Sequence, residues 1–359
     1  MKTLDKKMLD SLADTADGPV AIVRQQLMET AGLDRVLFPP TFASSGYEKT
    51  GYVIDKLGDG TLCALIDTVG SQVNRMEALF VGNEPANLGM YVPQIYITID
   101  RKSHTGDPIT EKISIMEAGH RLGDALVRSS ALGDESKAAF LAMLEQKNYG
   151  PIAKLSPTTL VFGAWDSRDT QAKLPRIVQS TVRAWDVDVL KRSAQYSPPI
   201  DYGKFNVFDE KDVEKAELDA TSGSSKNPLA QRGYVPVPAT DTHGGVRANG
   251  AITRDIVVNL VSLRHIQSAE KEGHLRQYIL GLSLAAAAFP LDGAYRQGCL
   301  LVPSTEPCPW QLVGRDGTRE DVEIDLDLLR SYLEPLAKPY LADPRCAPFD
   351  RKRAKADKK

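Results

Sequence analysis

The segment that begins at Trp165 carries the side chains with the most informative chemistry. From Arg168 to Arg183 it holds four basic residues and one aspartate, in a chain whose net charge is −3. Cations that follow phosphates, beside an aromatic ring on which a base can stack, are typical of proteins that bind single-stranded nucleic acid. A helix beginning near Pro175 would place four polar positions on one face: Lys173, Arg176, Ser180 and Arg183. The alternative is a solvated charged face beside a tryptophan of the core.

A second polar group lies at residues 71–77 (Ser-Gln-Val-Asn-Arg-Met-Glu), after a strand-like run that ends at Asp67. Apolar residues at helical spacing predict a helix over 69–81: Val69, Val73, Met76 and Phe80. Gln72, Asn74 and Arg75 then project away from the apolar face, where amides and a guanidinium suit contacts to phosphate or sugar. The alternative is a capping cluster on an ordinary surface helix.

Further arginines allow two interpretations each. Arg121 and Arg128 share one face of a helix expected over 115–130, and an ion-pair ladder with Asp124 explains them as well as RNA does. Three others stand near glycines around a long polar segment: Arg232, Arg247 and Arg254. A flexible arm that carries glycine and arginine can fold over a polyanion, or it can be only a loop.

No sequence pattern specifies an enzyme or a metal site. The phosphate-binding loop, G-x-G-x-x-G and H-E-x-x-H patterns are absent. Residues 281–285 imitate a nucleophile elbow only loosely, because they lie inside an apolar helix with no strand before it. The four cysteines contain no C-x-x-C pair. Four other candidate ligands fit no recognised metal spacing: His104, Asp107, Glu111 and His120. We therefore expect no catalytic residue, no metal and no cofactor.

Composition and length indicate a globular protein. The chain has 359 residues, 25% of them charged, and a sequence pI of about 6.0, so any basic surface is local. Lysines near the N-terminus are not followed by an apolar run, which excludes a signal peptide. The longest apolar run, Ile279–Phe289, has 11 residues, whereas a membrane-spanning helix needs roughly 20. We expect a cytoplasmic protein without membrane contact.

Strands and helices alternate irregularly with long loops, which favours an α+β fold over a doubly wound one. Helices are expected within 1–31 and at 69–81, 115–130, 134–147, 266–288 and 326–337, and from about Pro175. Strands are expected at 52–55, 62–67, 92–100, 160–165, 252–263, 298–302 and 322–324. Residues 197–250 combine prolines, glycines and an acidic run, so we expect a long mobile insertion there. Arg351–Lys359 is a basic tail.

An ordered set of motifs carries a family resemblance: 67–77 (DTVGSQVNRME), 119–130 (GHRLGDALVRSS), 160–167 (LVFGAWDS), 172–178 (AKLPRIV), 233–239 (GYVPVPA), 244–246 (GGV), 252–264 (ITRDIVVNLVSLR) and 275–287 (LRQYILGLSLAAA). Over about residues 33–303 the chain resembles the backbone RAMP subunit of type I-U (I-G) CRISPR Cascade complexes, a Cas seven-type protein. This implies a modified RRM-like (ferredoxin-like) palm in a single domain over 1–345, with a flexible insertion at about 197–250 and a basic tail at 346–359. A thumb hairpin would lie at 92–113 or at 234–254.

The same resemblance implies a role without catalysis. Copies would form a filament along a CRISPR RNA, hold its sugar-phosphate backbone and present the guide to target DNA. Other Cascade subunits and a recruited helicase-nuclease would be partners. The implied RNA-binding residues are Gln72, Asn74, Arg75, Arg121, Trp165, Asp166, Ser167, Arg168, Lys173 and Arg176, and Arg247 and Arg254 join them from the glycine-bearing segments. In the family the loop after Trp-Asp-Ser is often longer and rich in glycine, whereas here Arg168 follows directly.

Two other functions remain as alternatives. A RAMP-type endoribonuclease would need a general acid and base near a phosphate, for which His120 or His243 with a lysine are the candidates. An interaction module without RNA would use the acidic part of the insertion as a docking arm.

Overall fold

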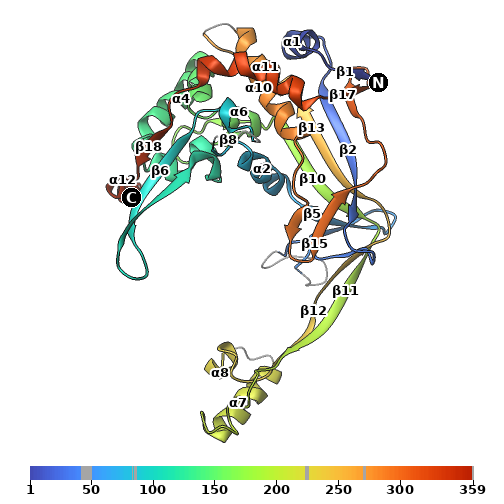
Figure 1. Cartoon of the computed structure of the whole chain (residues 1–359), viewed down its shortest axis with the longest axis vertical. Coiled ribbons are helices and arrows are strands. Elements are labelled where there is room, and N and C mark those ends of the chain that lie inside the picture. The colour runs from blue at the N-terminus through green and yellow to red at the C-terminus, as the bar shows by residue number, and fades with distance from the viewer. Residues whose placement is uncertain (42–50, 83, 85–86, 223–225, 270–271, 358–359) are drawn as a thin grey trace.

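The computed structural model describes residues 1–41, 51–82, 84, 87–222, 226–269 and 272–357 (Figure 1). Its centre, here called the palm, is an antiparallel sheet whose four main strands lie in the order β16 (Trp310–Val313), β2 (Ala21–Thr30), β13 (Ile252–Asn259) and β10 (Val178–Trp185). Along the chain, α2 (Val69–Ala78) stands between β2 and β10, and α10 (Glu272–Ala288) between β13 and β16. This βαββαβ order is ferredoxin-like, so the α+β, RRM-like palm is confirmed.

Further strands extend both edges of the palm. Beside β10 lie β5 (Leu62–Asp67) and β4 (Ile54–Lys56), which pair with each other near the strands expected at 52–55 and 62–67. Beside β16 lie β17 (Arg319–Glu323) and β1 (Lys2–Thr3). Strand β15 (Cys299–Pro303) pairs with β2 and with β14 (Ala294–Arg296). Three helices cover the end of the sheet near α10: α1 (Lys6–Asp14), α9 (Leu260–Arg264) and α11 (Leu326–Ala337).

The core lies between the palm sheet and its helices. On β10 every second residue is buried, and α2 packs against this strand: Val178, Ser180, Val182 and Ala184. From Tyr278 to Ala287, helix α10 is buried on all sides and is almost entirely apolar around its circumference. Ser283, the serine of the elbow-like pattern, donates to the Ile279 carbonyl inside this helix and is buried.

A second lobe, here called the helical lobe, is formed by residues 95–162 with the C-terminal segment. Its hairpin, β6 (Ile95–Lys102) and β7 (Pro108–Ser114), is joined in parallel by β18 (Arg345–Pro348). Its helices are α3 (Ala125–Arg128), α4 (Gly133–Gln146), α5 (Gly150–Leu155) and α6 (Pro157–Phe162). The basic segment at the C-terminus forms the short helix α12 (Arg351–Ala356).

A long hairpin, here called the arm, extends from the palm. It consists of β11 (Val187–Tyr196) and β12 (Val237–Ala248) and carries α7 (Glu210–Thr221) and α8 (Pro228–Gln231) at its far end (Figure 1). The acidic run is therefore helical, and its residues Val213 and Ala216 form a small buried core with Val235, which precedes β12. Gly244 allows the hairpin to close, since a Cβ there would lie 2.5 Å from the Leu190 carbonyl. The long insertion expected over 197–250 thus contains α7, α8 and the arm's second strand, and its mobility stays a prediction.

Several elements differ in type from the sequence expectation. Residues 21–30 form the strand β2, the segment after Pro175 forms the strand β10, and Leu160 lies in the helix α6. Val178 and Val182 are four residues apart, a spacing that satisfies both helical and strand periodicity, and the pairing of β10 with both β5 and β13 decides for the strand. The helix expected over 115–130 is divided into short turns at 115–117 and 121–123 followed by α3.

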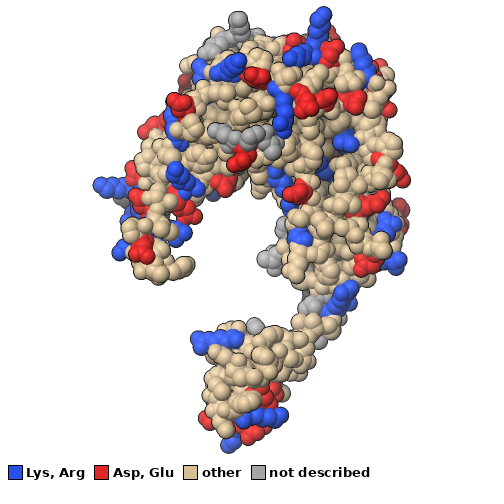
Figure 2. Space-filling view, in the orientation of Figure 1, with Lys and Arg blue, Asp and Glu red and all other residues tan. Residues whose placement is uncertain are grey.

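The two lobes and the arm enclose an open concave space (Figures 1 and 2). Figure 1 shows α2 and β8 (Ala164–Trp165) along its inner rim, with the β6–β7 hairpin on one side and the arm on the other. Within the described part of the chain, no helix is long and apolar enough to cross a membrane.

Candidate nucleic-acid interface

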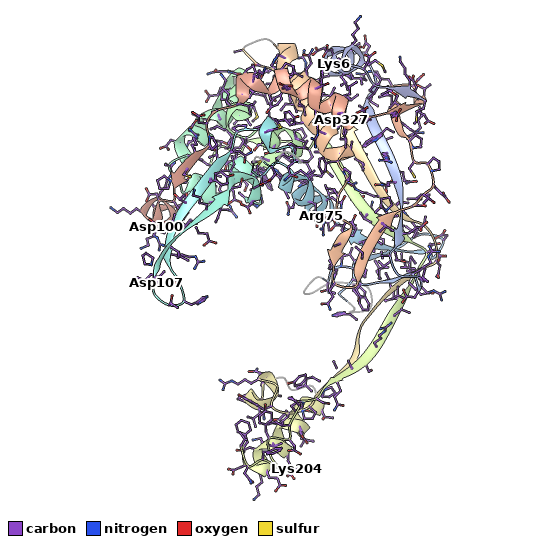
Figure 3. All side chains as sticks on the ribbon, in the orientation of Figure 1. Lys6, Arg75, Asp100, Asp107, Lys204 and Asp327 are labelled. Carbon is purple, nitrogen blue, oxygen red and sulfur yellow. The ribbon has the colours of Figure 1, made fainter. Side chains whose placement is uncertain are left out.

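Helix α2 presents an arginine of its last turn to the concave space. Thr68 caps the helix by accepting a hydrogen bond from the Ser71 amide at 3.1 Å. Arg75 Nε donates to Asp67 Oδ2 at 3.1 Å and Nη2 to the Tyr295 carbonyl at 3.0 Å, while its guanidinium lies 4.7 Å from the Tyr295 ring centroid. The side chain remains 27% exposed, and Figure 3 shows it at the inner rim. A preoriented cation therefore borders the space.

Gln72 is buried, which corrects the expectation that it projects from the helix surface. Its Nε2 donates to Asp67 Oδ2 at 2.7 Å, and its Oε1 accepts from Ser180 Oγ and from Arg254 Nε, both at 2.9 Å. Arg254 is also buried, and desolvation lowers its pKa to about 10. Among the residues predicted at this helix, only Asn74 is fully exposed. Gln72 and Arg254 join α2, β10 and β13 inside the palm.

Arg121 is likewise buried, rather than displayed on a helix. It forms a two-pronged ion pair with Glu77 of α2, Nε to Oε1 at 2.7 Å and Nη2 to Oε2 at 2.8 Å. Its Nη1 donates to the Gly163 carbonyl at 2.9 Å. Burial raises the pKa of Glu77 to about 7, against the opposing effect of the Arg121 charge. The pair connects α2 to the segment that precedes Trp165.

Trp165 and Lys173 form an exposed cation–aromatic pair. They are opposite each other in a small ribbon of β8 and β9 (Lys173–Leu174), and Lys173 Nζ lies 5.8 Å from the Trp165 ring centroid. Trp165 is 56% exposed, so the alternative of a core tryptophan is wrong. Gly163 permits the turn into the ribbon with a φ of +75°, where a Cβ would lie 2.7 Å from the Leu174 carbonyl oxygen. A flat apolar ring beside a cation can stack a base next to its phosphate.

The loop between β8 and β9 is organised by Asp166. This buried carboxylate accepts hydrogen bonds from the Thr170 amide at 2.9 Å and hydroxyl at 2.7 Å. The Ser167 carbonyl accepts from Gln171 Nε2 at 2.7 Å. Arg168 is exposed on the loop. Asp166 therefore shapes the loop, whereas Arg168 is available to a ligand.

The basic stripe expected over 173–183 does not exist as one face. Because residues from Val178 onward form a strand, Ser180 points into the core and Arg183 to the opposite side of the sheet, where it donates to Thr181 Oγ1. Arg176 precedes the strand and is exposed, and its charge acts on the Glu77 carboxylate, so it lies near α2. Arg247 is exposed on β12, in the register position opposite Asp188 of the arm.

Six of the expected residues thus remain wholly or partly exposed on α2, on the β8–β9 ribbon and on the segment after it, and we call them the rim surface: Asn74, Arg75, Trp165, Arg168, Lys173 and Arg176. No ion pair with a described residue involves Arg168, Lys173 or Arg176, so their charges are not neutralised within this part of the chain. Within the described ranges, no group of three or more His, Cys, Asp and Glu side chains could hold a metal ion.

Two participants were not identified from the sequence. Tyr295 supports the Arg75 guanidinium from 220 positions away, and no local pattern links them. Glu77 stands in the same motif as Arg75, and its place on the apolar side of the helix, next to Met76, was a usable signal for a buried, paired carboxylate.

Comparison with known proteins gives one family match. Residues 21–189 match the family described as "CRISPR-associated protein GSU0053". This range includes all six residues of the rim surface. No curated protein matches the chain. Among solved structures, a chain of a "CRISPR RNA-guided surveillance complex, pre-nicking" aligns over 90% of each chain at 10% identity with a TM-score of 0.32. A superposition at that score does not establish a common fold.

Proposed function

We propose that this chain is a non-catalytic backbone subunit of a type I-U (I-G) Cascade effector complex. The proposal is supported by the match of residues 21–189 to the family described as CRISPR-associated protein GSU0053. In this role the chain binds CRISPR RNA through the sugar-phosphate backbone and presents the guide for pairing with target DNA. Base pairing then reads the sequence, so the protein needs contacts to phosphate, sugar and base faces rather than to base edges.

The observation that carries the proposal is the exposed Trp165–Lys173 pair on the β8–β9 ribbon. Arg176 follows this ribbon in the chain and is exposed, and the preoriented Arg75 lies at the inner rim (Figure 3). The ring offers a stacking surface that tolerates any base, and the three cations suit successive phosphates. The acidic net charge of the chain is compatible with this, because only the groove has to be positive.

The arm and the β6–β7 hairpin suit the proposed assembly. In a filament each copy uses two different faces, so that contacts run head to tail along the RNA. We assign the thumb to the arm, which is the hairpin that continues β10 and β13 of the palm, rather than to β6–β7. Other Cascade subunits and a recruited helicase-nuclease then act on the target DNA.

The test is to purify the chain after co-expression with its complex partners and a CRISPR array, and to sequence any bound nucleic acid. The expected result is RNA of uniform length that carries repeat sequence. Affinity for single-stranded RNA should fall steeply with salt, because phosphate contacts release counterions. Recovery of protein without RNA at low salt would contradict the proposal. Cleavage of repeat RNA by the pure chain, lost in His120→Ala or His243→Ala, would favour an endoribonuclease instead.

A further inference from the structure

The rim surface combines two parts of the chain that share no strand pairing. Helix α2 supplies Asn74 and Arg75, whereas the β8–β9 ribbon supplies Trp165 and Lys173. In the described structure the two-residue strands β8 and β9 pair only with each other. Backbone pairing in a sheet therefore does not determine how the ribbon is placed relative to α2.

One buried ion pair makes this connection. Arg121 holds both carboxylate oxygens of Glu77 at 2.7 and 2.8 Å, and its third nitrogen donates to the carbonyl of Gly163 at 2.9 Å. Gly163 directly precedes β8. A single guanidinium thus bridges the carboxylate of α2 and the first peptide of the ribbon.

The geometry of this bridge is narrowly defined. A two-pronged guanidinium–carboxylate pair determines both distance and orientation. The Arg121 guanidinium lies 5.6 Å from the Phe162 ring centroid, and the Arg121 backbone has a φ of +53°, a conformation rare for residues other than glycine. Such backbone strain concentrates where a site depends on the geometry it produces.

We infer that Glu77 and Arg121 are positioning residues for RNA binding, which hold the Trp165–Lys173 pair at the correct distance and angle from Asn74 and Arg75. The inference rests on the proposed function, since it concerns the alignment of the same surface. A purely structural role predicts that the folded protein binds RNA normally without the pair, because a buried ion pair adds little stability over well-packed apolar side chains. If the pair serves alignment, its removal weakens the RNA contacts of the β8–β9 ribbon and leaves the RNA contacts of distant residues unchanged.

The test is a double-mutant cycle on the full-length chain, with labelled single-stranded oligouridine as the probe. The variants are Glu77→Gln, Trp165→Ala and both together. We expect each single change to weaken RNA binding about tenfold. The double variant should also bind about tenfold more weakly than wild type, and not about a hundredfold, because a misplaced Trp165 contributes nothing further. Arg247→Ala is the matched control on the arm, and its effect should multiply with that of Glu77→Gln.

A spectroscopic measurement separates alignment from stability. A base stacked on Trp165 quenches its fluorescence, so saturating RNA should quench wild type strongly and Glu77→Gln weakly, even when both are fully bound. If Glu77→Gln does not fold, the double replacement Glu77→Leu with Arg121→Met substitutes apolar side chains of similar volume and should show the same loss of quenching. Equal quenching, or multiplying effects of Glu77 and Trp165, would overturn the inference alone. Failure of the wild-type chain to bind RNA would overturn the proposed function and this inference with it.

Discussion

Arg254 Nε donates a 2.9 Å hydrogen bond to Oε1 of Gln72, although the two residues lie 182 positions apart. The same amide oxygen accepts from Ser180, and the amide nitrogen donates to Asp67. One buried side chain therefore ties α2 to three strands of the palm. The polar residues of α2 therefore have different roles: Gln72 holds the fold, whereas Arg75 borders the concave space and Asn74 is exposed.

Replacement of Gln72 should destabilise the fold. Gln72→Ala leaves Arg254, Ser180 and Asp67 without this partner in a buried position, so we expect the free energy of unfolding to fall by about 2–4 kcal/mol. Asn74→Ala, two residues further on an exposed face, should change it by less than about 0.5 kcal/mol. Denaturant titration of both variants measures the difference, and equal stabilities would contradict the role of Gln72.

Replacement of Trp165 should affect RNA binding far more than stability. The ring is 56% exposed, so Trp165→Ala costs little on folding, whereas the loss of a stacked base weakens RNA binding by about 1–3 kcal/mol. Trp165→Phe keeps a flat ring and should recover part of the affinity. Fluorescence anisotropy with a labelled single-stranded RNA gives the dissociation constants. Wild-type affinity in Trp165→Ala would exclude a stacking role.

Arg176 should act through its charge, independently of RNA sequence. Arg176→Ala removes one phosphate contact and should reduce the slope of log affinity against log salt by about 0.7 for a single strand. Arg183→Ala is the control, because Arg183 lies on the opposite face of β10 and donates to Thr181. Salt titrations with two RNAs of unrelated sequence test this. A slope that changes equally in both variants would be the opposing result.

The buried carboxyl of Glu77 predicts a pH dependence of stability. Its pKa is about 7 in the folded chain, mainly through burial, against about 4.3 in an unfolded chain. Between these values the folded state holds a proton that the unfolded state has released. This contribution to stability is therefore present at low pH and is lost as the pH rises through 7, with a slope of up to about −1.4 kcal/mol per pH unit.

Glu77→Gln removes this dependence, since the amide does not titrate. The charged groups that act on Glu77 are Arg121 and Arg176. Denaturant titrations of wild type and variant from pH 5 to 8 give a difference curve in which other titrating groups cancel. A flat difference curve would show that the carboxyl titrates at its ordinary pKa.

Gly163 should tolerate no side chain. Its φ is +75°, and a Cβ would approach the Leu174 carbonyl oxygen to 2.7 Å. We expect Gly163→Ala to lower the free energy of unfolding by about 1–3 kcal/mol and to displace the ribbon that carries Trp165. Gly58→Ala is the matched control, since a Cβ at Gly58 has no atom within 4 Å. Thermal melts of the two variants make the comparison, and similar melting temperatures would speak against a constrained turn.

Local patterns predicted the elements whose residues satisfy only one periodicity. Helix α11 spans 326–337 as expected, α2 begins at Val69 where the apolar spacing placed it, and β5 covers the expected strand at 62–67. The patterns failed at β10, where Val178 and Val182 fit both a helix and a strand. Its position as a central strand, hydrogen-bonded on both sides, outweighs the helical preference that Pro175 indicated.

The sequence alone determined the chemical inventory of the site: an aromatic ring, a lysine and arginines within a short stretch after residue 164, and an amide and a guanidinium within α2. Only the tertiary structure decided which of these face solvent. Burial depends on contacts between distant segments, such as Arg121 with Glu77 across 44 positions and Arg75 with Tyr295 across 220. Local periodicity carries no information about such partners, because the partner and not the spacing determines whether a polar side chain can be buried.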